Sequence, residues 1–207
     1  MGNLALEKNA VRERTNFGFT LIETLAVILM IGILAAIAGP SWVRFINQQR
    51  VNAANDAIFR AIQDAQGQAK KEKLRYSISF ITENTAQGIV PKFAIHPDSE
   101  NPNWQRLGKN LEIKPGQLII ATNLDAQENK KATSPSSPYN FTTKKTITFD
   151  SRGNLPLDTT PDEGLIIAVG IPQSTNSSQP HSLSRRCVKV TTLLGSLQTG
   201  REEECNL

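Results

Sequence analysis

A single apolar stretch near the N-terminus constrains this 207-residue chain more than any other feature of its sequence. Residues 19–39 read FTLIETLAVILMIGILAAIAG, and Glu23 is the only charged residue among them. As a helix, this stretch would extend roughly 31 Å, which is about the hydrocarbon thickness of a lipid bilayer. The short, polar and mildly basic flank before it favours a cytoplasmic N-terminus and translocation of the C-terminal part of the chain. Hydrophobic residues make up only 39% of the whole chain, which excludes a protein with several membrane spans.

Composition alone leaves two interpretations of this stretch. It fits an uncleaved signal anchor, and it also fits a secretory signal, because Ala36-Ile37-Ala38 matches the A-x-A cleavage pattern. Against a secretory signal, the apolar run exceeds the roughly 7–15 residues of such a segment and carries an acid near its start. A third interpretation accounts for that acid.

The hexapeptide Gly18–Glu23, with the sequence GFTLIE, leads directly into the apolar run. It resembles the recognition site of type IV prepilins. In that family a dedicated peptidase cuts after the glycine on the cytoplasmic side of the membrane and methylates the new N-terminus, and the apolar segment stays in the mature protein. The resemblance therefore implies cleavage between Gly18 and Phe19 and methylation of Phe19.

Glu23 would be the fifth residue of the mature chain. A carboxylate inside hydrocarbon is costly, so an acid at this place indicates a function. The resemblance implies that Glu23 pairs with the methylated amine of Phe19 on a neighbouring subunit, so that the charges neutralise each other as subunits leave the membrane for a filament. The alternative is that Glu23 lies at the membrane interface near the helix start, where the helix dipole favours an acid.

Pro40 closes the apolar run, and an amphipathic pattern begins after it. Many pilins carry a proline at this place, and the resemblance implies a kink where the helix curves or melts in the filament. A simple helix stop at Pro40 is disfavoured because helical periodicity resumes after it.

After Pro40, apolar residues recur at spacings of three or four and form one apolar stripe along the helix. We expect this stripe to pack on the chain's own globular domain. The stripe consists of Val51, Ala54, Ile58, Ile62, Ala65 and Ala69.

After Leu74 the apolar pattern changes to the period of two that is typical of strands. A helix followed by a run of strands predicts an α+β fold with antiparallel sheet. We expect strands at Arg75–Ile81, Ile89–His96, Gln117–Thr122, Thr146–Asp150, Leu165–Gly170 and Cys187–Leu194. Two polar stretches, 123–145 and 172–184, are expected to form exposed loops.

The whole chain is thus predicted to consist of four segments. These are a leader at 1–18, a transmembrane and filament-core helix at 19–40, an amphipathic helix at 41–74 and a globular β domain at 75–207.

Two C-terminal segments narrow the resemblance. Thr148–Leu155 is similar to the strand–turn–glycine segment of the GspH/FimT group of minor pseudopilins and pilins. Arg185–Val190, followed by Gly195, Gly200 and Arg201, resembles the closing strands of that group. The implied fold is a long N-terminal helix on an antiparallel β-sandwich. The implied function is a structural subunit that joins or primes a type IV pilus or a type II secretion pseudopilus. The acidic run Glu202–Glu204 and the polar loops depart from the group and leave the choice of machine open.

The two cysteines, Cys187 and Cys205, lie near the C-terminus. We expect a disulfide between them if the domain is exported, because disulfides persist in oxidising compartments. Two free thiols and half of a metal site are the alternatives, but there is no CxxC motif, and His96 and His181 have no ligand pattern around them. No metal and no cofactor are expected. The sequence also lacks GxSxG, HExxH, P-loop and Rossmann motifs, so we do not expect an enzyme, although a membrane-anchored enzyme remains the rival from another class.

A basic group near the C-terminus raises one further alternative, which is DNA binding. The group consists of Arg185, Arg186, Lys189 and Arg201. Some FimT-like minor pilins bind DNA through C-terminal basic residues, so the resemblance permits this. Against it, residues 76–207 carry 13 basic and 13 acidic residues, and DNA affinity scales with the number of phosphates neutralised.

The interpretation as a prepilin also predicts partners and a location. The expected partners are the prepilin peptidase, other pilins or pseudopilins, inner-membrane lipid and, under the alternative just given, DNA. The expected location is the bacterial inner membrane, as a single-pass protein whose C-terminal domain lies outside the cytoplasm, and then the filament.

Overall fold

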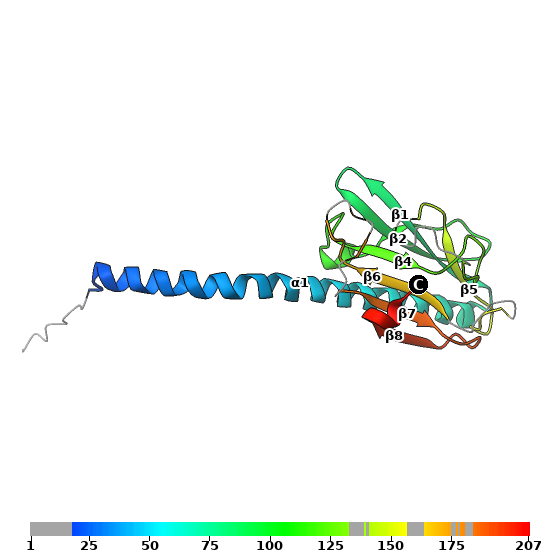
Figure 1. Cartoon of the computed structure of the whole chain (residues 1–207). Helices are drawn as coiled ribbons and strands as arrows, with labels where there is room; N and C mark the ends of the chain where they lie inside the picture. Colours follow the sequence, from blue (N-terminus) through cyan, green and yellow to red (C-terminus); the bar gives the residue numbers. More distant parts are fainter. Residues whose placement is uncertain are drawn as a thin grey trace, which may run out of the picture. The chain divides into compact units, whose positions relative to one another are not determined.

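The computed structural model describes residues 18–132, 139, 141–156, 164–174, 177, 179–180 and 184–207 (Figure 1). The chain forms two compact units, Met1–Val43 and Arg44–Leu207. The predicted leader, apart from Gly18, lies outside the described residues, and so does His181.

The first unit contains the start of helix α1, which runs Leu21–Glu72 in all. Its large apolar side chains are exposed throughout this unit, with Leu21 82% and Ile37 72% exposed. By length and composition this end of α1 could cross a membrane, and no other helix in the described part of the chain qualifies. Pro40 lies inside α1 and does not end it.

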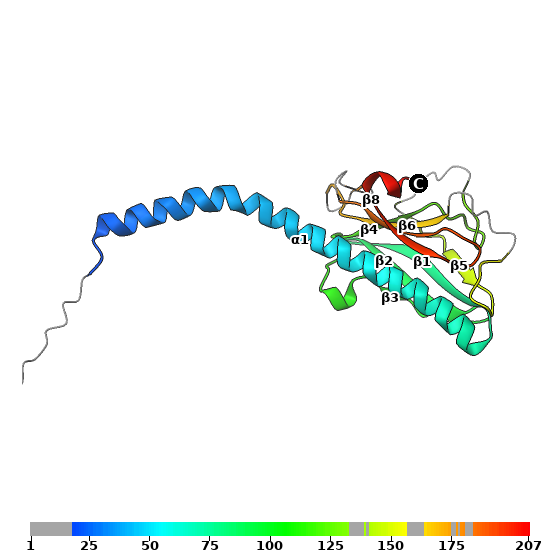
Figure 2. The same cartoon turned by 90° about the horizontal axis from the view of Figure 1, so that it is seen from below.

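The second unit begins with the remainder of α1, whose buried face is the apolar stripe predicted from the sequence. All six stripe residues are fully or almost fully buried, together with Asn55 and Ala61. The helix ends at Glu72 rather than at the expected Leu74, because Lys73 adopts the left-handed conformation with φ of 58°. Figure 2 shows this part of α1, in cyan and blue-green, running across the strands.

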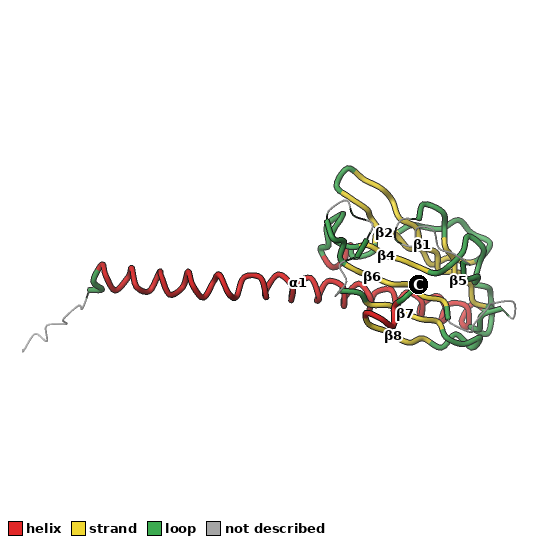
Figure 3. The backbone as a smooth tube through the Cα atoms, in the orientation of Figure 1, coloured by secondary structure: helices red, strands yellow, loops and turns green. Residues whose placement is uncertain are grey.

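Two four-stranded antiparallel sheets follow α1 in this unit. Figure 3 colours their strands yellow. Sheet A has the order β3-β2-β1-β5 and sheet B has the order β4-β6-β7-β8. The strands of sheet A are β1 (Tyr76–Thr85), β2 (Gly88–Pro97), β3 (Gln105–Arg106) and β5 (Lys145–Phe149). The strands of sheet B are β4 (Ile119–Thr122), β6 (Leu165–Gly170), β7 (Arg186–Val190) and β8 (Leu197–Arg201). Short 3₁₀ helices lie at η1 (Lys109–Leu111) and η2 (Glu202–Cys205).

One hydrophobic core joins α1 to both sheets. Ile58 and Ile62 of α1 belong to the same buried cluster as Phe80 and Phe149 of sheet A and Ile167 of sheet B. Each fully buried side chain of this size contributes roughly 1.5–3 kcal/mol relative to an exposed one. The prediction of a long helix packed on antiparallel sheets is confirmed.

The strands differ from the expectation in two ways. The sequence did not predict β3 or β8, and the expected strand Cys187–Leu194 ends already at Val190. The chain turns there because the Thr191 N–H donates to Ser196 O at 3.0 Å and Gly195 takes the left-handed φ of 73°. The turn reverses the chain into β8, which pairs with β7.

The stretch 123–145 was expected to be an exposed loop, but several of its described residues are buried. Asn123 and Asn129 are 1% and 3% exposed, and Leu124 and Phe141 are also buried. The two asparagine side chains account for this burial, since both hydrogen-bond to strand backbone. In the second polar stretch, residues 172–184, Pro172 forms a β-bridge with Pro180.

Candidate functional site

The predicted cleavage bond lies just before helix α1. Gly18 and Phe19 precede the helix, Phe19 is 76% exposed, and a Cβ added to Gly18 would meet no described atom within 4 Å. The helix then begins with a capped first turn, because Thr20 Oγ1 accepts a hydrogen bond from the Glu23 N–H at 3.3 Å. An exposed, non-helical dipeptide next to a stable helix start is a geometry that a peptidase can reach.

Glu23 lies in the first turn of α1, where the helix dipole favours a carboxylate. No described residue places a cation within ion-pair distance of it. The geometry agrees with the alternative in which Glu23 only complements the helix start. It also leaves the carboxylate available to a cation from another chain, which stays a prediction.

The predicted disulfide is present. Cys187 of β7 and Cys205 of η2 are bonded, with a Cα–Cα distance of 5.6 Å and a sequence separation of 18, and neither has exposed surface. The bond ties the 3₁₀ helix η2, near the C-terminus, to strand β7 of sheet B. A Cβ at Gly200 would lie 3.0 Å from Cys187 Sγ, so a glycine lets β8 pass close to the bond. Within the described ranges, no group of His, Cys, Asp and Glu side chains could hold a metal ion.

The four basic residues near the C-terminus do not share one face of sheet B. In the β7–β8 register, Arg186 lies opposite Arg201 and Lys189 lies opposite Gln198. Since side chains alternate along a strand, Arg186 and Arg201 are on one face and Lys189 is on the other. Arg185 lies just before β7, and its Nε is buried without a hydrogen-bond partner. The basic residues that are close in sequence are therefore distributed over both faces of the sheet.

Charge and burial also act against a uniformly basic surface. Burial and the neighbouring Arg201 lower the pKa of Arg186, whereas Asp56 and Glu202 act in the opposite direction. On the other face, Lys189 shares a cavity of about 400 Å³ with Glu203 and Glu204, among other residues. Cations on both faces of the sheet thus have acids in their surroundings.

The comparisons with known proteins agree with the N-terminal motif. No family model and no solved structure matches the chain. The chain is 44% identical over 62 residues to the type IV major pilin protein PilA of Myxococcus xanthus, which covers 30% of this chain and 28% of that protein. It is 30% identical over 105 residues to the type II secretion system core protein G of Pseudomonas aeruginosa, which covers 51% of this chain and 71% of that protein.

This chain belongs to the type IV pilin-like family. The resemblance stated from its first residues is therefore confirmed at the level of the family. Membership of the GspH/FimT group stays a prediction, because neither relative carries that name. The match to the pilin spans only 28% of that protein's length and 30% of this chain, so most of each protein lies outside the match.

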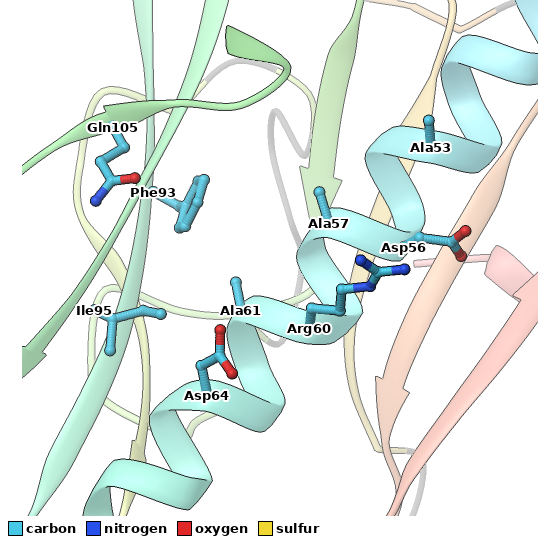
Figure 4. Close-up of a pocket in the computed structure, with 9 residues that line it drawn as sticks. All are labelled: Ala53, Asp56, Ala57, Arg60, Ala61, Asp64, Phe93, Ile95 and Gln105. Carbon is cyan, nitrogen blue, oxygen red and sulfur yellow. The ribbon is translucent and has the colours of Figure 1, made fainter. Parts of the chain in front are cut away.

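Sequence reasoning missed a groove on this pilin-like protein. It lies between α1 and strands β2 and β3, has a volume of about 520 Å³, and is shown in Figure 4. Phe93 and Ile95 of β2 face Ala57 and Ala61 of α1 across it. A signal was present in the sequence, since Ala53, Ala57 and Ala61 recur every four residues along one side of the helix. The lining contains Asp56, Arg60 and Asp64 but no Ser, His or Cys among the described residues, so it offers no nucleophile with a base.

A Ser–His pair occurs elsewhere in the protein, but its serine is buried within sheet A. Ser79 Oγ lies 3.0 Å from His96 Nε2, and His96 Nδ1 donates to Pro97 O at 2.8 Å. Ser79 has no exposed surface and also hydrogen-bonds to Thr146 Oγ1 at 2.9 Å. A hydroxyl that no substrate can reach stabilises sheet A instead.

Proposed function

We propose that this pilin-like protein is a structural subunit, a minor pilin or pseudopilin, that joins or primes a type IV pilus or a type II secretion pseudopilus. The observation that carries the proposal is the arrangement at the start of α1. An exposed Gly18–Phe19 bond precedes a capped helix whose large apolar side chains are exposed as far as Phe45 and whose only acid before Asp56 is Glu23. The relatives, a pilin and a secretion-system core protein, support this proposal.

The proposal implies an order of events in the maturation and assembly of the subunit. The leader 1–18 is removed by the prepilin peptidase, Phe19 is methylated, and the apolar part of α1 holds the subunit in the inner membrane with its C-terminal domain outside the cytoplasm. In a filament, packing against neighbouring apolar helices replaces the lipid contacts. The Cys187–Cys205 disulfide suits this location, because such bonds persist outside the cytoplasm.

The first test is the mature N-terminus, measured by mass spectrometry of protein from the membrane fraction. We expect N-methylated Phe19. Gly18→Val should block cleavage, whereas Gly32→Ala, whose Cβ would meet no described atom within 4 Å, should not. A start at Gly39 would indicate an ordinary secretory signal, and an uncut Met1 a plain anchor. Either result would overturn the proposed function.

The second test concerns Glu23. Glu23→Ala should be cleaved normally but enter filaments poorly, because the methylated amine of the neighbouring Phe19 would lose its countercharge. The measurement is the amount of subunit in sheared filament fractions relative to the membrane fraction. Glu100→Ala, a change of an exposed acid in the turn after β2, is the control and should behave as wild type. Equal incorporation of both variants would remove the charge-pairing argument.

A further inference from the structure

Two arginines face each other directly at one border of sheet B. Arg186 of β7 and Arg201 of β8 are paired in the antiparallel register. The Cβ atoms of such directly opposed residues are about 4.5–5.5 Å apart, and like charges in this position destabilise a sheet. Arg201 lies on the edge strand β8 and is exposed, whereas Arg186 is partly buried on the face of β7 whose Val188 and Val190 join the core, so another molecule can reach the pair from the Arg201 side.

Acids lie near this pair, and Glu204 Oε2 accepts a hydrogen bond from the Arg201 backbone N–H at 3.0 Å, but no described carboxylate forms an ion pair with either guanidinium. Arg186 is nevertheless partly buried. Burial and Arg201 both lower the pKa of Arg186, which reports the unfavourable surroundings of its charge. Asp56 and Glu202 oppose this effect from beyond ion-pair distance. A charge in this position is stabilised once an anion contacts it directly.

The surroundings of the pair select the kind of anion. The planar fork of a guanidinium matches a carboxylate, and two forks side by side can hold one carboxylate between them. A long polyanion fits poorly, because the acidic run Glu202–Glu204 follows Arg201 directly and Lys189 lies on the other face of the sheet. Of the basic residues on β7 and β8, only Arg186 and Arg201 share this face of the sheet, whereas nucleic-acid binding depends on many phosphate contacts.

We propose that Arg186 and Arg201 together bind a single carboxylate side chain presented by a neighbouring subunit of the filament. The source of the carboxylate rests on the proposed function, while the affinity of the pair for a carboxylate does not. Contacts of this kind between different surfaces of successive subunits are the ones that build an open helical assembly. In the unassembled protein the two charges repel each other, and in the filament the carboxylate holds them together.

The first experiment measures incorporation of full-length variants into filaments. Arg201→Gln and Arg186→Gln should lower incorporation several-fold, and Arg201→Glu should lower it further because it repels the carboxylate. Arg152→Gln removes an exposed arginine in the turn after β5 and serves as the matched control with wild-type incorporation. Incorporation of Arg201→Gln and Arg201→Glu at the wild-type level would overturn the proposal.

The second experiment uses thermal unfolding of the unassembled full-length chain in detergent. Arg201→Gln should raise the unfolding midpoint, because it removes the repulsion between the two guanidiniums. Glutarate, added as a carboxylate probe at constant ionic strength, should raise the midpoint of the wild type but not that of Arg201→Gln. A lower midpoint for Arg201→Gln would show that Arg201 is already stabilised within the chain, and would overturn the proposal.

The two experiments separate this inference from the proposed function. If the wild type enters filaments and the arginine variants do so equally, only the inference fails. If the wild type enters no filament, the proposed function and the filament source of the carboxylate both fail, and the glutarate response alone decides whether the pair binds a carboxylate. Salt-sensitive binding of a 20-base-pair DNA duplex that is lost in Arg201→Gln, with incorporation unchanged, would assign the pair to phosphate and overturn the proposal.

Discussion

Gln66 shows how a single side chain of α1 holds two turns that are far apart in sequence. Its Nε2 donates to Gly153 O at 2.7 Å and to Leu194 O at 3.2 Å. Both turns contain a glycine with positive φ, Gly153 at 79° and Gly195 at 73°. A Cβ at Gly195 would lie 2.5 Å from Gln66 Nε2 and 3.1 Å from Gly153 O, so the contact requires glycine. The turn before Leu155 and the turn between β7 and β8 are thus fixed to the same helix.

We predict that Gln66→Ala lowers the free energy of unfolding by about 1–2 kcal/mol, because two backbone carbonyls lose their donor. Chemical denaturation monitored by circular dichroism measures this. The control Gln63→Ala, at an exposed position one turn earlier in the same helix, should change stability by less than about 0.5 kcal/mol. Equal effects of the two substitutions would show that the Gln66 contacts contribute nothing.

The glycines give an independent test at the same place. Gly195→Ala should destabilise by about 1–3 kcal/mol, because it combines a left-handed backbone with a steric clash. Gly67→Ala, one residue after Gln66 in α1, places its Cβ in open space and should stabilise by up to about 1 kcal/mol. The two substitutions are chemically identical, so opposite signs in the same denaturation assay isolate the effect of the turn. A neutral Gly195→Ala would contradict the close contact between the turn and Gln66.

At the scale of elements, one asparagine side chain in each sheet completes the hydrogen bonding of strand backbone. Sheet A ends at β5, and Asn129 pairs with both backbone groups of Thr148 there: its Nδ2 donates to Thr148 O at 3.0 Å and its Oδ1 accepts from Thr148 N at 2.8 Å. Asn123 makes the equivalent pair of bonds at the start of β6, with Gly164 O and Ile166 N. Edge strands with unpaired backbone promote aggregation, and the Asn129 side chain occupies such a position at the edge strand β5, whereas β6 is an interior strand.

We predict that Asn129→Ala destabilises by about 2–4 kcal/mol, because it leaves a buried N–H and a buried C=O of Thr148 without partners. It should also increase aggregation on heating, since the edge of β5 becomes available for pairing. Light scattering during thermal unfolding measures both effects. Asn101→Ala, at an exposed position after β2, is the control. An Asn129→Ala variant as stable as this control would show that water satisfies the β5 edge equally well.

The disulfide acts at the C-terminal end of the chain, where it ties η2 to β7 of sheet B. Replacing Cys187 and Cys205 together by alanine should lower the free energy of unfolding by about 2–4 kcal/mol, as expected for a loop of this size. Hydrogen exchange should then show loss of protection at Gly200 and in η2, while β1 and β2 of the other sheet keep theirs. Uniform loss of protection over both sheets would mean that the bond stabilises the whole unit rather than its last elements.

These elements also show what the sequence could and could not predict. The stripe from Val51 to Ala69 was predictable because helical periodicity depends only on the spacing of apolar residues within one continuous segment. Strand β8 was missed because its residues, LQTGR, are mostly polar and come after a turn that only the structure places. Strand β3 has two residues and therefore no periodicity at all. The prepilin hexapeptide was recognisable because it is contiguous, whereas the facing of Arg186 and Arg201 depends on the register between two strands.

At the scale of the whole molecule, the two units differ in kind. The first unit has an exposed apolar surface suited to anchoring, and the second contains the folded core. In the described part of the chain, every buried apolar residue lies at Val51 or later, and the large apolar side chains before Phe45 are exposed. The first unit thus contributes apolar surface that no described residue of the chain covers. The second unit contains the core, both sheets and the disulfide.

We therefore predict that a fragment of residues 44–207 folds without the first unit. Its free energy of unfolding should match that of the full-length chain in the same detergent to within about 0.5 kcal/mol, because no buried side chain is removed. A shorter fragment, 55–207, loses Val51 and Ala54, both without exposed surface, and should be less stable by about 2–4 kcal/mol. Denaturant unfolding of all three proteins provides the comparison. If 44–207 were as destabilised as 55–207, the apolar start of α1 would be required for folding of the globular unit as well as for anchoring, and the division between the units would be wrong.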